Sequence, residues 1–157
     1  MKRKVYTLEE AQKKLEYFCA YQDRSHWEVQ KKLKEMRMIP EAIDQIIIHL
    51  IQENYLNEER FTRSFVRGKF YQKKWGKNKI KQGLYKHKIH PNLIEKAFSE
   101  INDKDYKQSI RDLIAKKKND YKTNHSYQLK QKISNYLLQK GYAYDEFAEI
   151  LENMLKT

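Results

Sequence analysis

The middle of the chain carries a block of positive charge that no acidic residue interrupts. Residues 60–94 contain 11 Lys and Arg and no Asp or Glu. The other 22 Lys and Arg of the 157-residue chain are nearly balanced by its 21 Asp and Glu, so this block holds almost all of the net charge of +12. Such a block attracts polyanions or an acidic protein surface. The candidate contact residues are Arg60, Arg63, Arg67, Lys69, Lys73, Lys74, Lys77, Lys79 and Lys81.

Lysines dominate the part of this block that joins two expected helices around Gly76. A lysine acts as a point charge and can follow a phosphate backbone without reading bases. We expect the backbone N–H groups at the start of the following helix to add to an anion site there. Trp75 and Tyr71 could stack on bases, but aromatic residues at helical spacing are more often in a core. We therefore expect core packing for Phe61, Phe65 and Trp75.

The helix expected after Asn57 has two neighbouring stripes of side chains. The mostly apolar stripe contains Phe61, Phe65, Gly68, Gln72 and Trp75. The cationic stripe contains Arg60, Arg63, Arg67 and Lys74. Like charges on one helical face repel by a few tenths of a kcal/mol per pair, so an unpaired row indicates a partner with negative charge. A solvated face that only keeps the protein soluble is the alternative, and the absence of acids in the block favours the partner.

Other chemistries find no support in the sequence. There is no Gly-rich phosphate loop, nucleophile elbow or paired-carboxylate motif, so we expect neither an enzyme nor a cofactor. His87 and His90 lack further ligands at metal-binding spacing, so we expect no metal site. The single Cys19 fits a reducing cytoplasm and a buried position on a helix. No signal peptide or apolar run long enough to span a bilayer is expected, which predicts a cytoplasmic protein.

The elements that position the basic block are predicted to be helices. Four Gly, two Pro and 34% charged residues are typical of all-helical proteins. Thr7 with Glu10, and Ser25 with Glu28, form capping boxes that predict helix starts. Pro40 suits the first position of a third helix.

Apolar positions then repeat along the chain at constant offsets of 51 and 53 residues. The first set is Val29, Leu33, Met38, Pro40, Ile43 and Ile47. The second is Ile80, Leu84, Ile89, Pro91, Ile94 and Phe98, and the third is Ile133, Leu137, Tyr142, Tyr144, Phe147 and Leu151. Units of this size bury little by themselves, so copies pack in a row. We predict an all-α fold of three tandem three-helix repeats (1–54, 55–102 and 103–157) that form an elongated, curved array.

Details of the third copy test how well the repeats match. We expect a polar loop at residues 119–125 between two helices, and Ser126 as the cap of the second. Gly141 suits a left-handed turn at the end of that helix. The equivalent positions hold Arg37 and Lys88, where a left-handed conformation costs about 1 kcal/mol. We therefore expect differently shaped turns at those two positions.

Several segments, in this order, resemble the RecX family. The strongest is 55–61 with 64–67, followed by Gly76, Ile80 and Leu84. Before it stand 23–25 with Glu28 and Leu33, and after it stand 130–133, Leu137 and 141–142. The resemblance covers almost the whole chain and implies tandem three-helix repeats. It also implies a protein that binds the RecA recombinase and the RecA–DNA filament and modulates, usually inhibits, recombinase, ATPase and coprotease activities in DNA repair and the SOS response.

Two functions therefore remain open at this point, and without the resemblance a third, a repeat scaffold for some other protein, stays open as well. The first is a monomeric RecA-filament regulator whose central copy contacts DNA phosphate or acidic filament surface. The second is a helix-turn-helix-like module that binds DNA or RNA alone, without sequence specificity and with steep salt dependence. Binding that requires RecA and responds weakly to salt would reject the second.

Overall fold

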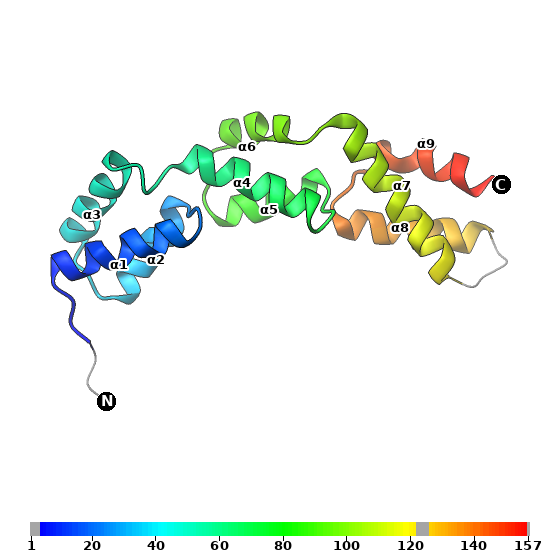
Figure 1. The fold of residues 1–157 in the computed structure, drawn as a ribbon. Coiled ribbons are helices and arrows are strands. Elements are labelled where there is room, and N and C mark those ends of the chain that lie inside the picture. Colours follow the sequence, from blue (N-terminus) through cyan, green and yellow to red (C-terminus); the bar gives the residue numbers. More distant parts are fainter. Residues whose placement is uncertain (1–3, 122–125, 157) are drawn as a thin grey trace. The chain divides into compact units, whose positions relative to one another are not determined.

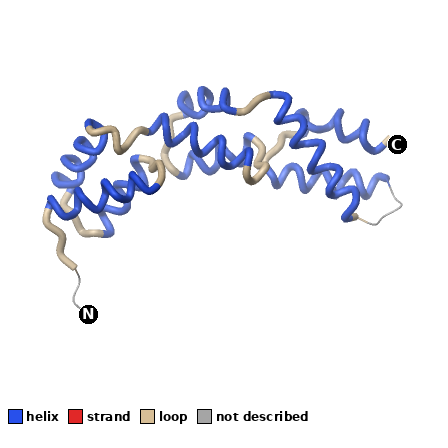
Figure 2. The backbone as a smooth tube through the Cα atoms, viewed as in Figure 1, coloured by secondary structure: helices blue, strands red, loops and turns tan. Residues whose placement is uncertain are grey.

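The computed structural model describes residues 4–121 and 126–156, and helices are the regular elements in that part of the chain (Figure 1). Their bounds are α1 Leu8–Tyr21, α2 His26–Glu35, α3 Pro40–Gln52, α4 Glu58–Tyr71, α5 Lys77–Lys86, α6 Pro91–Ala97, α7 Asp103–Asp120, α8 Ser126–Lys140 and α9 Tyr144–Leu155. A short 3₁₀ helix, Phe98–Glu100, follows α6. Figure 2 shows helices joined by loops and no strand in the described residues. The all-helical prediction is confirmed.

The predicted helix starts are also confirmed. In the first capping box, Glu10 N donates to Thr7 Oγ1 at 3.1 Å and Thr7 N donates to Glu10 Oε1 at 3.0 Å. Ser25 and Glu28 form the same pair of bonds at the start of α2. Reciprocal bonds of this kind satisfy backbone donors that the first helical turn leaves without partners.

The three predicted sets of apolar positions occupy equivalent places in successive helix triplets. Val29, Ile80 and Ile133 are fully buried on α2, α5 and α8. The next three equivalents are also fully buried: Leu33, Leu84 and Leu137. The offsets therefore reflect repeated packing positions, and the helical repeat architecture is confirmed. The boundaries 1–54, 55–102 and 103–157, and the elongated curvature, stay predictions.

The contacts group the chain into two compact units. Unit 1 comprises residues 1–64 and 84–94, and unit 2 comprises residues 65–83 and 95–157. In unit 1, α3 packs on α1 and α2. Its buried residues include Ala11, Leu15, Cys19, Val29, Leu33, Ile46 and Leu50. In unit 2, α7, α8 and α9 pack on one another, and their buried residues include Ile110, Ile114, Ile133, Leu137, Phe147 and Leu151.

The turns that end α2, α5 and α8 share one conformation, which corrects the prediction for two of them. Arg37 and Lys88 both have φ of 60°, in the left-handed region, and Gly141 has φ of 102°. The residue after each one donates its N–H to the carbonyl five positions earlier, at 3.0–3.2 Å. These bonds satisfy carbonyls at the helix end, and they outweigh the conformational cost at the two residues that have a side chain.

The third copy departs from prediction at one further place. Helix α7 continues to Asp120, so residues 119 and 120 are helical rather than part of a loop. Ser126 is the first residue of α8. Tyr121 follows α7 as its non-helical cap residue, and residues 122–125 of the predicted loop lie outside the described residues.

The left-handed turn at Lys88 predicts that glycine is the better residue there. We expect Lys88→Gly to raise the free energy of unfolding by about 1 kcal/mol, because glycine adopts positive φ without a steric cost. Gln82→Gly, at an exposed position inside α5, is the matched control and is expected to lower it by about 1 kcal/mol. Urea unfolding of both variants measures the difference, and a loss of stability in Lys88→Gly would contradict the proposed strain.

Candidate functional site

The predicted cationic stripe on α4 is not an unpaired row, which corrects the prediction. In unit 1, Arg60 Nε lies 2.8 Å from Asp23 Oδ1 and Arg63 Nη2 lies 3.2 Å from Glu59 Oε1. In unit 2, Arg67 Nη1 lies 3.2 Å from Glu100 Oε2. The acids lie outside residues 60–94, so counting charges within the block could not reveal them.

Arg60 has a structural role within unit 1. Its guanidinium group also donates to Asn54 Oδ1 and to the backbone carbonyls of Asn54 and Tyr55, at 3.1–3.2 Å. These carbonyls belong to the link between α3 and α4. Arginine's rigid fork of donors suits such multiple contacts. Arg60 therefore ties this link to Asp23, and less of its charge is available to a partner.

Two lysines of the candidate set also have carboxylate neighbours, both in unit 2. Lys74 Nζ lies 3.7 Å from Asp112 Oδ2, and Lys81 Nζ lies 3.3 Å from Glu95 Oε1. Exposed ion pairs of this kind contribute about 0–1 kcal/mol. They neutralise charge locally without holding the lysines firmly.

Trp75 lies between two of the remaining lysines. Lys69 Nζ is 4.8 Å and Lys79 Nζ 4.6 Å from the centre of its indole ring. The chain leaves α4 through a left-handed residue, Lys74, with φ of 57°. Trp75 N then donates to Lys69 O at 3.0 Å, which brings the ring back beside α4. Each ammonium–indole contact contributes about 0.5–1 kcal/mol at an exposed site.

The expected core role holds for only one of the three aromatic residues. Phe61 is buried in unit 1, whereas Phe65 and Trp75 are half-buried in unit 2. Gln72, from the predicted apolar stripe, is exposed. The buried residues of α4 are Phe61, Thr62, Val66 and Phe70. The buried stripe is thus shifted by about one residue from the predicted one, and α4 ends at Tyr71, before Trp75.

The start of α5 does not offer its N–H groups to a ligand, which corrects a second prediction. Gly76 N donates to Lys140 O at 2.8 Å, and Asn78 N donates to Gly141 O at 2.9 Å. Lys77 N donates to the Tyr106 hydroxyl at 3.0 Å. The positive N-terminal end of α5 therefore meets the negative C-terminal end of α8, an arrangement that helix dipoles favour. We call this contact the α5–α8 joint.

The joint leaves no space for side chains at its two glycines. A Cβ atom on Gly76 would lie 2.4 Å from the Gly141 carbonyl carbon, and one on Gly141 would lie 2.4 Å from Lys79 Cβ. Tyr142 donates its hydroxyl to Lys74 O at 2.8 Å and so fixes the α4–α5 loop. Burial raises the pKa of Tyr142 to about 12, so the phenol keeps its proton at neutral pH. Sequence reasoning identified both glycines but did not predict that their two loops touch each other.

The joint brings lysines from outside the basic block to the candidate site. Lys140 Nζ donates to Lys73 O at 3.1 Å. Burial lowers the pKa of Lys140, and Lys79, Lys116, Lys117 and Lys74 lower it further. Burial also lowers the pKa of Lys69, with further lowering by Lys73 and Lys79. Lysines of α4, α5, α7 and α8 therefore sense one another's charge within unit 2.

Metal and membrane chemistry gain no support from the part of the chain that the structure describes. No group of three or more His, Cys, Asp or Glu there could hold a metal ion. None of the described helices is both long and apolar enough to cross a bilayer. Cys19 is buried, and burial raises the pKa of its thiol to about 11, which disfavours the reactive thiolate.

Comparison with known proteins shows one consistent likeness. The models for the second and third three-helix domains of RecX match residues 57–97 and 103–151. Regulatory protein RecX of Mannheimia succiniciproducens is 32% identical over 130 residues, which cover 82% of this chain and 84% of that protein. The RecX of Clostridium acetobutylicum is 28% identical over 81% of this chain, which spans only 60% of that longer protein. The crystal structure of RecX from Lactobacillus salivarius superimposes with a TM-score of 0.84 at 27% identity, over 93% of this chain and 95% of that one.

The crowded glycine of the joint gives a stability prediction. We expect Gly141→Ala to lower the free energy of unfolding by about 2–5 kcal/mol, because a Cβ atom clashes with Lys79 and the positive φ disfavours a side chain. The control is Gly68→Ala on α4, where an added Cβ meets nothing within 4 Å. That substitution is expected to stabilise by about 0.5–1 kcal/mol. Equal effects in urea unfolding would show that the joint is not tightly packed.

The lowered pKa values of Lys69 and Lys140 predict unusual reactivity. At a pH below the ordinary lysine pKa of about 10.4, a lowered pKa leaves a larger fraction of neutral, nucleophilic amine. We expect limited acetylation, followed by peptide mass spectrometry, to modify both residues faster than the exposed Lys96 and Lys104. Slower acetylation of Lys69 and Lys140 than of Lys96 and Lys104 would contradict the mutual repulsion of the lysines. Acetylation of the denatured protein is the control, because the same order of rates there would show that the difference does not come from the fold.

Proposed function

Because this chain belongs to the RecX family of regulatory proteins, we propose that it binds the RecA recombinase and the RecA–DNA filament and regulates them. The observation that carries the proposal is the match of two successive RecX three-helix domains, supported by a 32% identical relative that the chain covers to 84% of its length. The proposed effect is inhibition of recombinase, ATPase and coprotease activities, as part of DNA repair and the SOS response. The proposed setting is the cytoplasm, and the proposed acting form is a monomer without catalytic activity of its own.

The repeat architecture supplies a physical reason for action on a filament. A filament presents the same surface again and again, and tandem small units can make several weak contacts with it. Linked contacts raise the overall affinity without requiring any single strong one. The proposed contact residues remain the nine of the basic block: Arg60, Arg63, Arg67, Lys69, Lys73, Lys74, Lys77, Lys79 and Lys81.

The ion pairs favour four of these nine as the residues that respond most to a partner. Arg60, Arg67 and Lys74 already face carboxylates of this chain. Among the described residues, no carboxylate forms an ion pair with Lys69, Lys73, Lys77 or Lys79. A partner's negative charge therefore gains most at these lysines.

The test is ATP hydrolysis by RecA assembled on single-stranded DNA. We expect the wild-type protein to lower the rate in proportion to its concentration. The triple variant Lys69→Gln, Lys73→Gln, Lys79→Gln is expected to need about 10–100 times more protein for the same effect, if each contact is worth about 0.5–1 kcal/mol. The matched control removes the same charge from exposed lysines of the same unit: Lys96→Gln, Lys104→Gln and Lys107→Gln.

The possible outcomes test the proposed function and the proposed contact site separately. A wild-type protein that leaves both filament assembly and ATP hydrolysis unchanged would contradict regulation of RecA. If the first triple variant inhibits as strongly as the wild type and its helical circular dichroism is unchanged, the assignment of the contact site to these three lysines is contradicted, but regulation of RecA is not. Equal losses in both triple variants would indicate a response to net charge rather than to a site.

A further inference from the structure

We propose that unit 2 contains a binding site for a run of adjacent phosphates, formed by lysines from two separate repeats. We call it the lysine cluster, and it consists of Lys69, Lys73, Lys79, Lys116 and Lys140. Its ligand class is a flexible phosphate chain, which single-stranded nucleic acid or inorganic polyphosphate can supply. The inference goes beyond regulation of RecA, because it requires no recombinase, and two of the five lysines lie outside the basic block.

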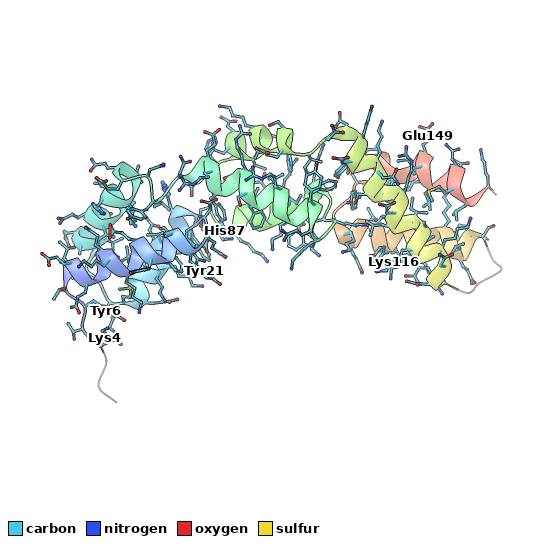
Figure 3. All side chains as sticks on the ribbon, viewed as in Figure 1. Lys4, Tyr6, Tyr21, His87, Lys116 and Glu149 are labelled. Carbon is cyan, nitrogen blue, oxygen red and sulfur yellow. The ribbon has the colours of Figure 1, made fainter. Side chains whose placement is uncertain are left out.

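Contacts within unit 2 bring the five lysines together. Lys140, the last residue of α8, donates its ammonium group to Lys73 O at 3.1 Å. Lys69 and Lys79 both lie against Trp75, at 4.8 and 4.6 Å from the ring centre. Figure 3 labels Lys116 on α7, which packs against α8. Burial lowers the pKa of Lys69 and of Lys140, and the further lowering by Lys73 and Lys79 at Lys69, and by Lys79 and Lys116 at Lys140, supports the same proximity.

The lysines of the cluster have no carboxylate partner in the described part of the chain. Among the residues that the structure describes, no carboxylate forms an ion pair with any of its five members. Lysines just beside it do have such partners, since Lys74 pairs with Asp112 and Lys117 with Asp120. The ammonium groups of Lys69 and Lys79 both lie close to the centre of the Trp75 ring, so the distance between them cannot exceed the sum of their two distances to that centre. Since the Debye length is about 8 Å, salt screens the repulsion between these two groups only partly. An anion bound here would relieve that repulsion.

The residue types favour phosphate over carboxylate. Arginine binds carboxylates in a bidentate manner, but the three arginines of the basic block already face Asp23, Glu59 and Glu100. The cluster contains only lysines, which act as compact point charges and suit the closely spaced charges of a phosphate chain. A single strand of DNA carries one such charge about every 3.4 Å along the axis.

The surroundings of Trp75 favour contact with the backbone rather than the bases of a nucleic acid. Two ammonium groups already lie against its half-buried ring. A base could stack there only after displacing them, and displacement would remove the charges that attract the strand. We therefore expect binding that depends on phosphates and is indifferent to base identity.

The test uses the full chain without RecA and three probes: oligothymidylate, an abasic deoxyribose-phosphate strand of the same length, and inorganic polyphosphate. We expect the two strands to bind with similar affinity, with log K falling against log salt at a slope of about −3 to −4 if five phosphates are contacted. Polyphosphate should compete with both. Binding of oligothymidylate but not of the abasic strand would overturn the proposal in favour of base stacking.

The variant Lys79→Gln, Lys116→Gln, Lys140→Gln removes three cluster members from three helices. It is expected to reduce the salt slope by about 2 and the affinity by about tenfold or more at low salt. Lys96→Gln, Lys104→Gln, Lys107→Gln serves again as the control of equal charge and should stay close to wild type. Equal losses in the two variants would overturn the cluster as a site.

Protection of lysines in the wild-type protein from acetylation by a bound ligand provides a readout that does not depend on whether a variant folds. The abasic strand should slow acetylation of Lys69, Lys79 and Lys140 several-fold relative to Lys96 and Lys104. A polyglutamate peptide that protects the cluster better than the abasic strand would overturn the proposal in favour of an acidic protein segment. The assay contains no RecA, so its failure leaves the proposed regulation standing, and the reverse also holds.

Discussion

Unit 2 depends on a contact between two helix ends. Gly76 N, just before α5, donates to Lys140 O at the end of α8, and Asn78 N of α5 donates to Gly141 O. Glycines at positions 76 and 141 allow the two backbones to approach. Each helix end thereby satisfies groups that its own hydrogen-bond ladder leaves without partners. The contact also fixes the α4–α5 loop, since Tyr142 and Lys140 both donate to carbonyls of that loop. The position of the lysines follows from this backbone contact rather than from attraction among side chains.

The fold divides the cationic side chains of the basic block into two classes, those that pair with an acid and those that do not. Arginines find acids within their own unit, Asp23 and Glu100 from other segments and Glu59 from α4 itself, and serve the structure as much as any partner. Several lysines remain without such acids among the described residues, and they lie beside further lysines of α7 and α8. Folding therefore concentrates repulsion in one place instead of spreading it over the surface. Unit 2 stays folded without a bound anion only because the α5–α8 joint and the apolar contacts beneath it outweigh the repulsion among these lysines.

Much of the fold follows from local sequence signals. Helix starts were predictable because Thr7 and Ser25 each stand three residues before a glutamate. The repeats were predictable because equivalent apolar positions recur at fixed offsets and are buried at each recurrence. The turns at Arg37 and Lys88 were mispredicted, because residue propensity was given more weight than the hydrogen bonds that the shared turn provides.

The candidate site was less predictable, because its geometry depends on segments distant in sequence. Asp23 and Glu100, which pair with arginines of α4, lie outside the basic block. Lys140 lies 67 residues after Lys73, whose carbonyl it contacts. The N–H groups of α5 were expected to be open, but the end of α8 covers them. Charge counting along the chain identifies where cations are abundant, whereas tertiary contacts decide which of them keep an uncompensated charge.

The most direct test of this account is NMR titration of the lysine side chains, with and without the abasic phosphate strand. The free protein should show pKa values for Lys69 and Lys140 below the ordinary lysine value. Binding should raise both toward the ordinary lysine value, because a bound anion favours the protonated amine. Unchanged pKa values on addition of the strand would contradict the central claim that these lysines together form an anion site.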